Sequence, residues 1–344
     1  MGTLLVHTPG PFSSLQDLGR EGWSSIGLPR GGAADPFALR IGNRLLGNPD
    51  DAPAIEMTSV GGVFDFDDEA VMVLAGSAMG AEVHGPDGSV APAQTFQPRW
   101  VAAGTRVMLT QTRSGFRAYF CIAGGVGTRV GMNISTGDVS LESSDVLSRR
   151  LCKGDRVEFG TGQTLPRRAV DCGAARALFE QYCMRREIRA VEGVHTEMFA
   201  SCQVEKFWAS VFGVSRRSDR AGIRLEGAMI APRSEPVPGG AGRMETEGMV
   251  WGAVQVPQGG EPIVLMAEHP TTGGYPVIAC VATVDFGVLG QLGFADGCAP
   301  IRFIKVSKHE ALALYRERER RLDEVFGHHG QKFGQQTDRQ GTRD

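Results

Sequence analysis

The sequence lacks the short motifs that mark the commonest nucleotide-dependent and hydrolytic enzymes. It contains no G-x-x-x-x-G-K-[ST] loop, no dinucleotide fingerprint between a strand and a helix, and no G-x-S-x-G elbow. No H-E-x-x-H or other histidine cluster suggests zinc, so we predict no metal site. No lysine lies between two methionines, as biotin attachment would require. If ATP or biotin takes part, we therefore expect another chain to supply the nucleotide loop or the tethered cofactor.

A strong net charge and long apolar runs are also absent. The net charge is −3, with acidic and basic residues mixed along the chain, which predicts no nucleic-acid or anionic-membrane partner. No apolar run approaches the ~20 residues of a membrane span, and the N-terminus lacks a signal-peptide pattern. The seven cysteines form no C-x-x-C pair, which is typical of reduced thiols. These features predict a cytoplasmic protein.

Aromatic residues are few, at 7%, whereas glycine is abundant, with 47 of 344 residues. Many short strands joined by tight turns produce this balance, so we predict a mainly β fold. The length is sufficient for two domains. A polar stretch near residues 161–168 marks the predicted boundary, and a charged helix is predicted over 308–325.

The first polar block, residues 14–48, places polar side chains among glycines. Asp35 is a suitable N-cap, Pro36 fits the first helical position, and Gly47 fits the position after the helix end. Free N–H groups at this helix start favour an anion. The alternative is a capped helix whose loop is held by an Asp17–Arg20 ion pair. The candidate binding residues of this block are Gln16, Asp17, Arg20, Arg40 and Asn43.

The second polar block runs from Ser218 to Pro276. Ser218 and Asp219 can orient Arg220 and Arg224, whose guanidinium groups suit carboxylate or phosphate. The alternative is a tight turn with an Asp–Arg salt bridge. Farther on, Glu247 and Gln255 flank a glycine turn, and a nest of N–H donors around an oxyanion is predicted at Thr271, Thr272, Gly273, Gly274 and Tyr275. His269 beside Pro270 is a candidate general base or an ordinary loop histidine.

Several separated motifs occur in an order that resembles one family, the biotin-dependent carboxyltransferases, also described as allophanate hydrolase subunit 2 or as the C subunit of 5-oxoprolinase. The motifs are Leu15-Gln16-Asp17-Leu18-Gly19-Arg20, Gly32-Ala33-Ala34-Asp35-Pro36, Ala123-Gly124-Gly125, Ser218-Asp219-Arg220, Gly252-Ala253-Val254-Gln255-Val256-Pro257 and Thr271-Thr272-Gly273-Gly274-Tyr275-Pro276. The resemblance runs over residues 3–306. It implies two cyclophilin-like β-barrels, residues 1–165 and 185–307, followed by a charged helix and a disordered tail over 308–344.

The resemblance implies a subunit of a heteromeric ATP-dependent 5-oxoprolinase, which converts 5-oxoproline, ATP and water to glutamate, ADP and phosphate. Its partners would be a subunit 1 (Kip-inhibitor-like) protein and a LamB/YcsF-type subunit, with ATP shared among the subunits. One alternative is a carboxyltransferase subunit acting on urea or a related amide, with biotin carried by another chain. A second is a non-catalytic regulatory protein that binds a Kip-inhibitor-like partner.

The opening of 5-oxoproline and the carboxylation of urea both place charge on an amide oxygen, and both need hydrogen-bond donors in fixed positions around it. We assign Arg220, Arg224 and the 271–275 turn as those donors, and Asp35, Asp219 and Glu247 as catalytic groups that orient them or move protons. Replacing Arg220 with Ala is then expected to abolish activity and leave the fold intact.

The chain departs from the family pattern at three places. The glycine-rich Gly-Gly-Phe-Gly-Gly segment that usually precedes the Gly-Asp strand is missing from Asp138–Arg150. The family's usual Ser-Gly-Ala-Met-Asp is Gly31-Gly32-Ala33-Ala34-Asp35 here. The usual Asp-Arg before Gln-Thr-Thr-Gly-Gly is Glu268-His269 before Pro270. These departures predict a divergent substrate or a subunit without activity of its own.

Overall fold

The described residues before Gly160 include nine strands that form one antiparallel sheet. In this computed structural model the described residues are 1–127, 150–161, 170–233, 244–293 and 300–327. The main strand order is β2-β3-β8-β4-β1-β9, with β5 paired to β8 and to the short strands β6 and β7. The strands are β1 (Gly2–Thr8), β2 (Ser13–Gln16), β3 (Ala54–Thr58), β4 (Val63–Phe66), β5 (Ala70–His84), β6 (Val90–Pro92), β7 (Arg99–Val101), β8 (Arg106–Ile122) and β9 (Arg156–Phe159).

Strand β8 is longer than the sequence predicts. Stretches rich in β-branched or aromatic residues predict two separate strands, Thr105–Gln111 and Arg117–Ala123, with turn residues between them, but the chain continues as one strand paired with β5. The pairing register shifts between Gly76 and Ala81, opposite this segment, and Gly115 adopts a φ of 74°. The turn residues are therefore accommodated as β-bulges within a continuous pair.

The second half forms a closed seven-stranded barrel in the order β10-β17-β14-β15-β12-β11-β18. A separate two-stranded ribbon, β13-β16, lies beside it. The strands are β10 (Glu187–Glu192), β11 (Val211–Val214), β12 (Gly222–Gly227), β13 (Glu247–Gly248), β14 (Ala253–Gln255), β15 (Ile263–Leu265), β16 (Thr272–Gly273), β17 (Val277–Val281) and β18 (Ile301–Lys305). The prediction of a mainly β fold built from two barrel-like units is confirmed, with the first unit a half-barrel sheet.

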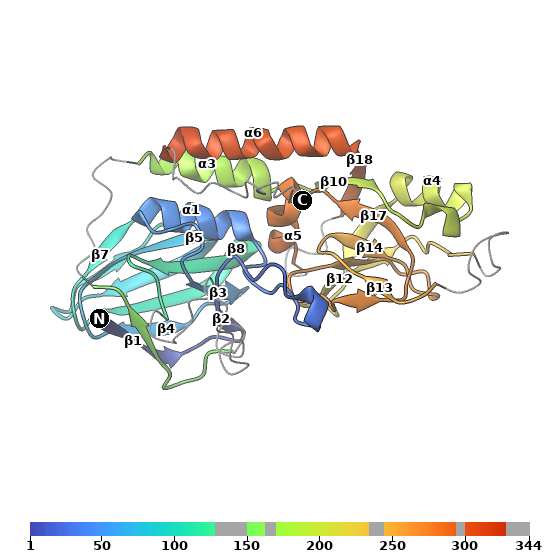
Figure 1. The fold of residues 1–344 in the computed structure, drawn as a ribbon. Coiled ribbons are helices and arrows are strands. Elements are labelled where there is room, and N and C mark those ends of the chain that lie inside the picture. The colour runs from blue at the N-terminus through green and yellow to red at the C-terminus, as the bar shows by residue number, and fades with distance from the viewer. Residues whose placement is uncertain (128–149, 162–169, 234–243, 294–299, 328–344) are drawn as a thin grey trace, which may run out of the picture.

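Helices connect the two β units, as Figure 1 shows with α6 lying along the top of the molecule. The α-helices of the described residues are α1 (Pro36–Leu46), α3 (Cys172–Cys183), α4 (Ser201–Ala209), α5 (Phe286–Gln291) and α6 (Lys308–Phe326). Helix α6 begins with a capping box of Ser307 and Glu310 and contacts both α3 and the barrel strand β10. It confirms the predicted charged helix.

Within the part of the chain that the structure describes, no helix is long and apolar enough to cross a membrane. The proposed domain boundaries and the cytoplasmic location stay predictions. The predicted disordered tail lies outside the described residues.

Candidate functional site

A cavity of about 490 Å³ lies where the two β units meet. One wall comes from the loop between β2 and α1 and from the first turns of α1. The opposite wall comes from the β13–β14 turn and the segment after β15, and α5 and α6 complete it. Its basic lining residues are Arg20, Arg30, Arg40, His269 and Arg318, and Glu21 is an acidic one. We call this cavity the arginine pocket.

The loop before α1 folds back on itself and needs glycine to do so. Gly19 and Gly32 both have positive φ, at 82° and 85°. A Cβ on Gly32 would lie 2.5 Å from the Gly19 backbone nitrogen, which is too close for any side chain. The Gly31 N–H also donates to the Ala267 carbonyl of the barrel, at 2.9 Å. The glycines of the first block therefore shape the wall that carries Arg20 and Arg30.

An aromatic pair lines the barrel side of the arginine pocket. Trp251 and Phe286 stack with ring centroids 4.4 Å apart, and the Arg30 guanidinium lies 5.5 Å from the Trp251 ring centre. Arg30 Nε is buried and has no hydrogen-bond partner among the described residues. Its nearest carboxylate is that of Glu21, 3.4 Å away on an exposed side chain. Arg30 is therefore a cation with spare donor capacity at the pocket.

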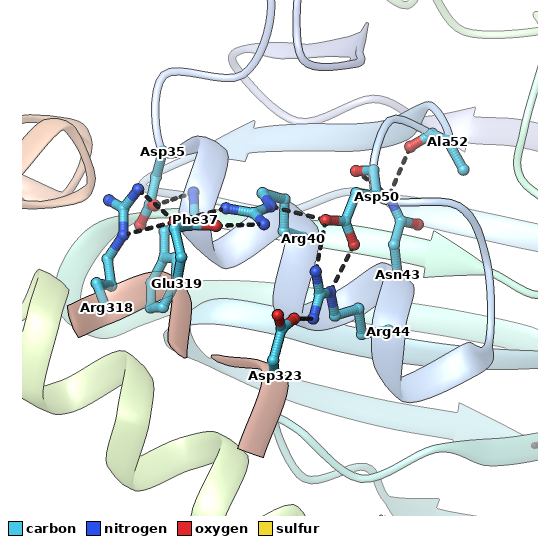
Figure 2. Close-up of polar contacts among 10 residues, drawn as sticks. All are labelled: Asp35, Phe37, Arg40, Asn43, Arg44, Asp50, Ala52, Arg318, Glu319 and Asp323. Carbon is cyan, nitrogen blue, oxygen red and sulfur yellow. Dashed lines mark hydrogen bonds and ion pairs between the residues drawn. The ribbon is translucent and has the colours of Figure 1, made fainter. Parts of the chain in front are cut away.

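Carboxylates already balance the charges of two other pocket arginines, Arg40 and Arg318, as Figure 2 shows. Arg40 donates to Asp50 and to both carboxylate oxygens of Glu319 on α6. Arg318 donates to Glu319 and to the carbonyls of Thr283 and Val284, and its guanidinium lies over the ring of Phe37. Burial alone would lower the pKa of Arg40, but Glu319 and Asp50 raise it, so this group stays charged.

These contacts make Arg20 and Arg30 the guanidinium groups best placed to receive an external anion. Arg20 is half-buried, and within the described part of the chain its guanidinium interacts electrostatically with Asp17 without a hydrogen bond. Together the two groups fit a carboxylate or a phosphate. Of the residues predicted from the sequence, the structure brings Arg20, Arg40 and His269 to the pocket lining.

Asp35 is at the start of α1, as predicted, but it faces the protein interior. Its carboxylate accepts the N–H groups of Phe37 and Ala38, and Gln291 of α5 donates to it at 2.7 Å. The residue is fully buried. Asp35 therefore caps α1 and links it to α5, and it does not line the arginine pocket.

The pKa of Asp35 predicts a pH dependence of stability. Burial raises this pKa to about 6, from the ordinary value of 3.8. The folded protein therefore keeps a proton that the unfolded chain releases, so stability decreases as the pH rises from about 4 to about 6. Relative to Asp35→Asn, we expect the wild type to lose on the order of 3 kcal/mol over that window, since each pKa unit corresponds to about 1.4 kcal/mol. Urea unfolding of both proteins across the window measures this difference, and a constant difference would contradict it.

The other predicted residues of the first block are also held by internal contacts. Asn43 donates to the carbonyls of Asp50 and Ala52, Gln16 donates to Ser14, and Asp17 accepts the Gly19 N–H. The charges of Asp17 and Arg20 interact electrostatically, but neither a close ion pair nor a hydrogen bond joins the two side chains among the described contacts. These residues shape the loop and helix and do not line the pocket.

Arg220 is buried at the junction of the two β units. It bonds the Glu56 carboxylate of β3, donates to the Gly32 carbonyl at 2.6 Å, and donates to Glu268 at 2.7 Å. Burial alone would raise the pKa of Glu56, but Arg220 and Arg117 hold it below its ordinary value. The assignment of Arg220 as a substrate donor is therefore revised, because each of its three guanidinium nitrogens already donates to a protein group.

The remaining turn residues of the second block close the β11–β12 hairpin. Exposed Asp219 accepts the N–H groups of Ala221 and Gly222, and Ser218 accepts that of Arg224. Arg224 is exposed on β12. None of the predicted trio Ser218, Asp219 and Arg224 lines the arginine pocket, so their role as site residues is not supported by its geometry.

The predicted oxyanion turn lies in the β13–β16 ribbon. Glu247 pairs with Gly273 and Gly248 with Thr272, and exposed Tyr275 follows this ribbon. Buried Gln255 donates to the Tyr275 carbonyl at 3.4 Å. Glu247 lies 3.2 Å from His195 Nε2. The ribbon borders the pocket through Met249, whose N–H donates to the Thr271 carbonyl.

Several pocket residues were not predicted. Arg30, Trp251, Phe286, Tyr315 and Arg318 line it but lie outside the recognised motifs or within apolar segments. One missed residue carried a signal: Glu56 is a single carboxylate in the apolar strand Ala54–Thr58, and a buried acid needs a buried partner.

Comparisons with known proteins agree on one family. Residues 26–303 match the family model described as carboxyltransferase domain, subdomain A and B. The chain is 31% identical over 322 residues to the C subunit of 5-oxoprolinase from Escherichia coli (strain K12), covering 94% of this chain and 97% of that protein. It is 28% identical over 321 residues to the urea amidolyase of Saccharomyces cerevisiae, covering 90% of this chain and 17% of that protein.

The fold of the chain also resembles that of a solved structure of a urea amidolyase. The structure of the K. lactis urea amidolyase superposes with a TM-score of 0.78 at 25% identity. The match covers 94% of this chain and 20% of that chain, so this chain spans about a fifth of that larger enzyme.

Proposed function

The chain belongs to the family of carboxyltransferase domains, subdomains A and B, and from that premise we propose that it is a subunit of a heteromeric ATP-dependent 5-oxoprolinase. In this role it binds the anionic lactam 5-oxoproline in the arginine pocket. The observation that carries the proposal is the pair of cations, Arg20 and Arg30, beside the stacked rings of Trp251 and Phe286.

The pocket suits the chemistry of 5-oxoproline in two ways. Its carboxylate would pair with the guanidinium groups, and its flat five-membered ring would lie against the aromatic pair. The similarity over nearly the whole length of the E. coli 5-oxoprolinase chain supports the same function. ATP supplies the phosphoryl group that activates the lactam oxygen, and the partner subunits share its binding. The subunit 1 (Kip-inhibitor-like) and LamB/YcsF-type proteins are the proposed partners.

The direct test is co-expression of the chain with both proposed partners. ATP- and 5-oxoproline-dependent glutamate release should require all three chains. No release from the full set would overturn the proposal.

Removing the charge of Arg30 tests the pocket itself. Arg30→Gln keeps a polar stem beside Trp251 but removes the cation, so we expect the KM for 5-oxoproline to rise about 10- to 100-fold, because a charged hydrogen bond contributes about 1.5–3 kcal/mol. Initial rates against 5-oxoproline concentration measure the change. The matched control is Arg217→Gln, which removes an exposed arginine paired with Glu261 and should leave KM unchanged. An unchanged KM in Arg30→Gln would remove this residue from the substrate site.

A second candidate is carboxyl transfer to urea or a related amide, with biotin carried by another chain. The family's description as a carboxyltransferase domain and the similarity to urea amidolyases favour it. Urea-dependent ATP hydrolysis that requires bicarbonate and a biotinylated carrier would select this function over the first. Partner binding without either turnover would instead support the regulatory alternative.

A further inference from the structure

His269 is a buried histidine that lines the arginine pocket. Its Nδ1 lies 2.8 Å from the carbonyl oxygen of Pro270. A carbonyl oxygen only accepts hydrogen bonds, so Nδ1 must carry the proton of this bond. In the neutral ring Nε2 is then the unprotonated nitrogen, with a lone pair available to accept a proton.

The surrounding backbone holds this ring in place. The His269 N–H donates to the Met266 carbonyl at 3.1 Å. The preceding residue, Glu268, is fixed twice by Arg220, through its own N–H to the Arg220 carbonyl and through the Arg220 guanidinium. His269 is therefore pre-positioned, and among the described contacts no protein group bonds its Nε2.

The charges around His269 favour its neutral form. Burial lowers its pKa below the ordinary value of 6.5, the positive charge of Arg30 lowers it further, and the bond to Pro270 opposes both. The titratable and charged groups that share the pocket are Arg20, Glu21, Arg30, Arg40, Tyr315 and Arg318. No carboxylate among the described residues forms an ion pair with His269, so the ring is neutral at pH 7 and ready to accept a proton.

We propose that His269 Nε2 is the general base that removes the amide N–H proton of the substrate bound in the arginine pocket. This inference rests on the proposed function, which supplies a lactam and a nucleoside triphosphate. As the lactam oxygen bonds to phosphorus, the phosphoanhydride bond of the donor breaks. The nitrogen pair forms a C=N bond, and the N–H proton moves to Nε2. The phosphorylated product is thereby left without the positive charge that would drive the step backwards.

The test uses variants that separate the base from the hydrogen bond to Pro270. Asparagine carries an amide donor close to the Nδ1 position, so His269→Asn can keep the bond to Pro270 and loses only Nε2. In the three-chain complex we expect its kcat to fall about 100-fold, within the range for a lost general base, with an unfolding temperature close to that of the wild type. The control His84→Asn, at a partly exposed histidine paired with Glu82, should retain full activity.

Two further readouts distinguish catalysis from structure. The wild-type kcat/KM should decrease at acidic pH, with an apparent pKa below 6.5. An NMR titration of His269 in the isolated chain should give the same pKa. The His269→Asn variant should lose this acidic decrease in kcat/KM. Added imidazole should restore part of the activity of His269→Ala. A complex in which His269→Asn keeps the wild-type rate and acid limb would overturn this inference alone. A wild-type complex without turnover would overturn the proposed function and this inference with it.

Discussion

Replacing Arg220 with methionine should lower the free energy of unfolding by about 3–5 kcal/mol, the cost of removing one partner from a buried ion pair. Glu56 would keep its contacts with the Ala34 N–H and the Tyr119 hydroxyl, but its carboxylate would face only Arg117, 3.5 Å away. The Gly32 carbonyl would lose its guanidinium donor at the same time. Urea denaturation of the isolated chain measures the change.

The controls for Arg220 follow from its partners. Arg217→Met, at an exposed pair, should change the free energy of unfolding by less than about 1 kcal/mol. The double variant Arg220→Met with Glu56→Gln should not recover the loss, because buried Arg117 would then lose the carboxylate with which it forms an ion pair. A destabilisation of Arg220→Met no larger than that of the exposed control would contradict the buried-pair account.

Asp50→Ala should lower the free energy of unfolding by a similar amount, about 3–5 kcal/mol, because this one carboxylate accepts hydrogen bonds from two buried arginines. Arg40 Nε and both Arg44 Nε and Nη2 donate to Asp50 at 2.7–2.9 Å (Figure 2). Without it, the two guanidinium groups keep only their bonds to Glu319 and Asp323 on α6. The repulsion between two neighbouring cations then adds to the loss.

Two comparisons make this result specific. Glu324→Ala, on the exposed side of α6, removes a single pair with Arg320 and should change stability by less than about 1 kcal/mol. Asp323→Ala should fall between the two, because this half-buried carboxylate bonds Arg44 but is more exposed than Asp50. Equal effects for Asp50→Ala and Glu324→Ala would contradict the structural role of the cluster.

The buried ion pairs around Arg220 and around Asp50 also hold parts of the proposed site in place. Arg220 joins the first sheet to the segment that carries His269, and the Arg40–Glu319 pair joins α1 to the helix that carries Arg318. A variant in either cluster should therefore change both stability and activity. The Arg30 and His269 variants should change activity with little effect on stability, so the two groups of residues separate experimentally.

The sequence alone determined the features that depend on local chemistry. Asp35, Pro36 and Gly47 defined the ends of α1 because caps act on the nearest backbone groups. Ser307 and Glu310 likewise fix the start of α6. The glycine-rich composition indicated a β fold, and ordered motifs indicated the family, since both are properties of the chain rather than of its packing.

The tertiary structure decided which polar residues face a ligand. Asp35, Arg40 and Arg220 lie in the two polar blocks, as Arg20 does, but a sequence pattern does not reveal whether a partner from a distant segment balances the charge of a side chain. Glu56 lies 164 residues from Arg220, and Glu319 lies 279 residues from Arg40. Burial of a charge is tolerated only where such a partner meets it. The two blocks that looked like one site in the sequence therefore separate into the contacts that join the two β units and the pocket that those contacts enclose.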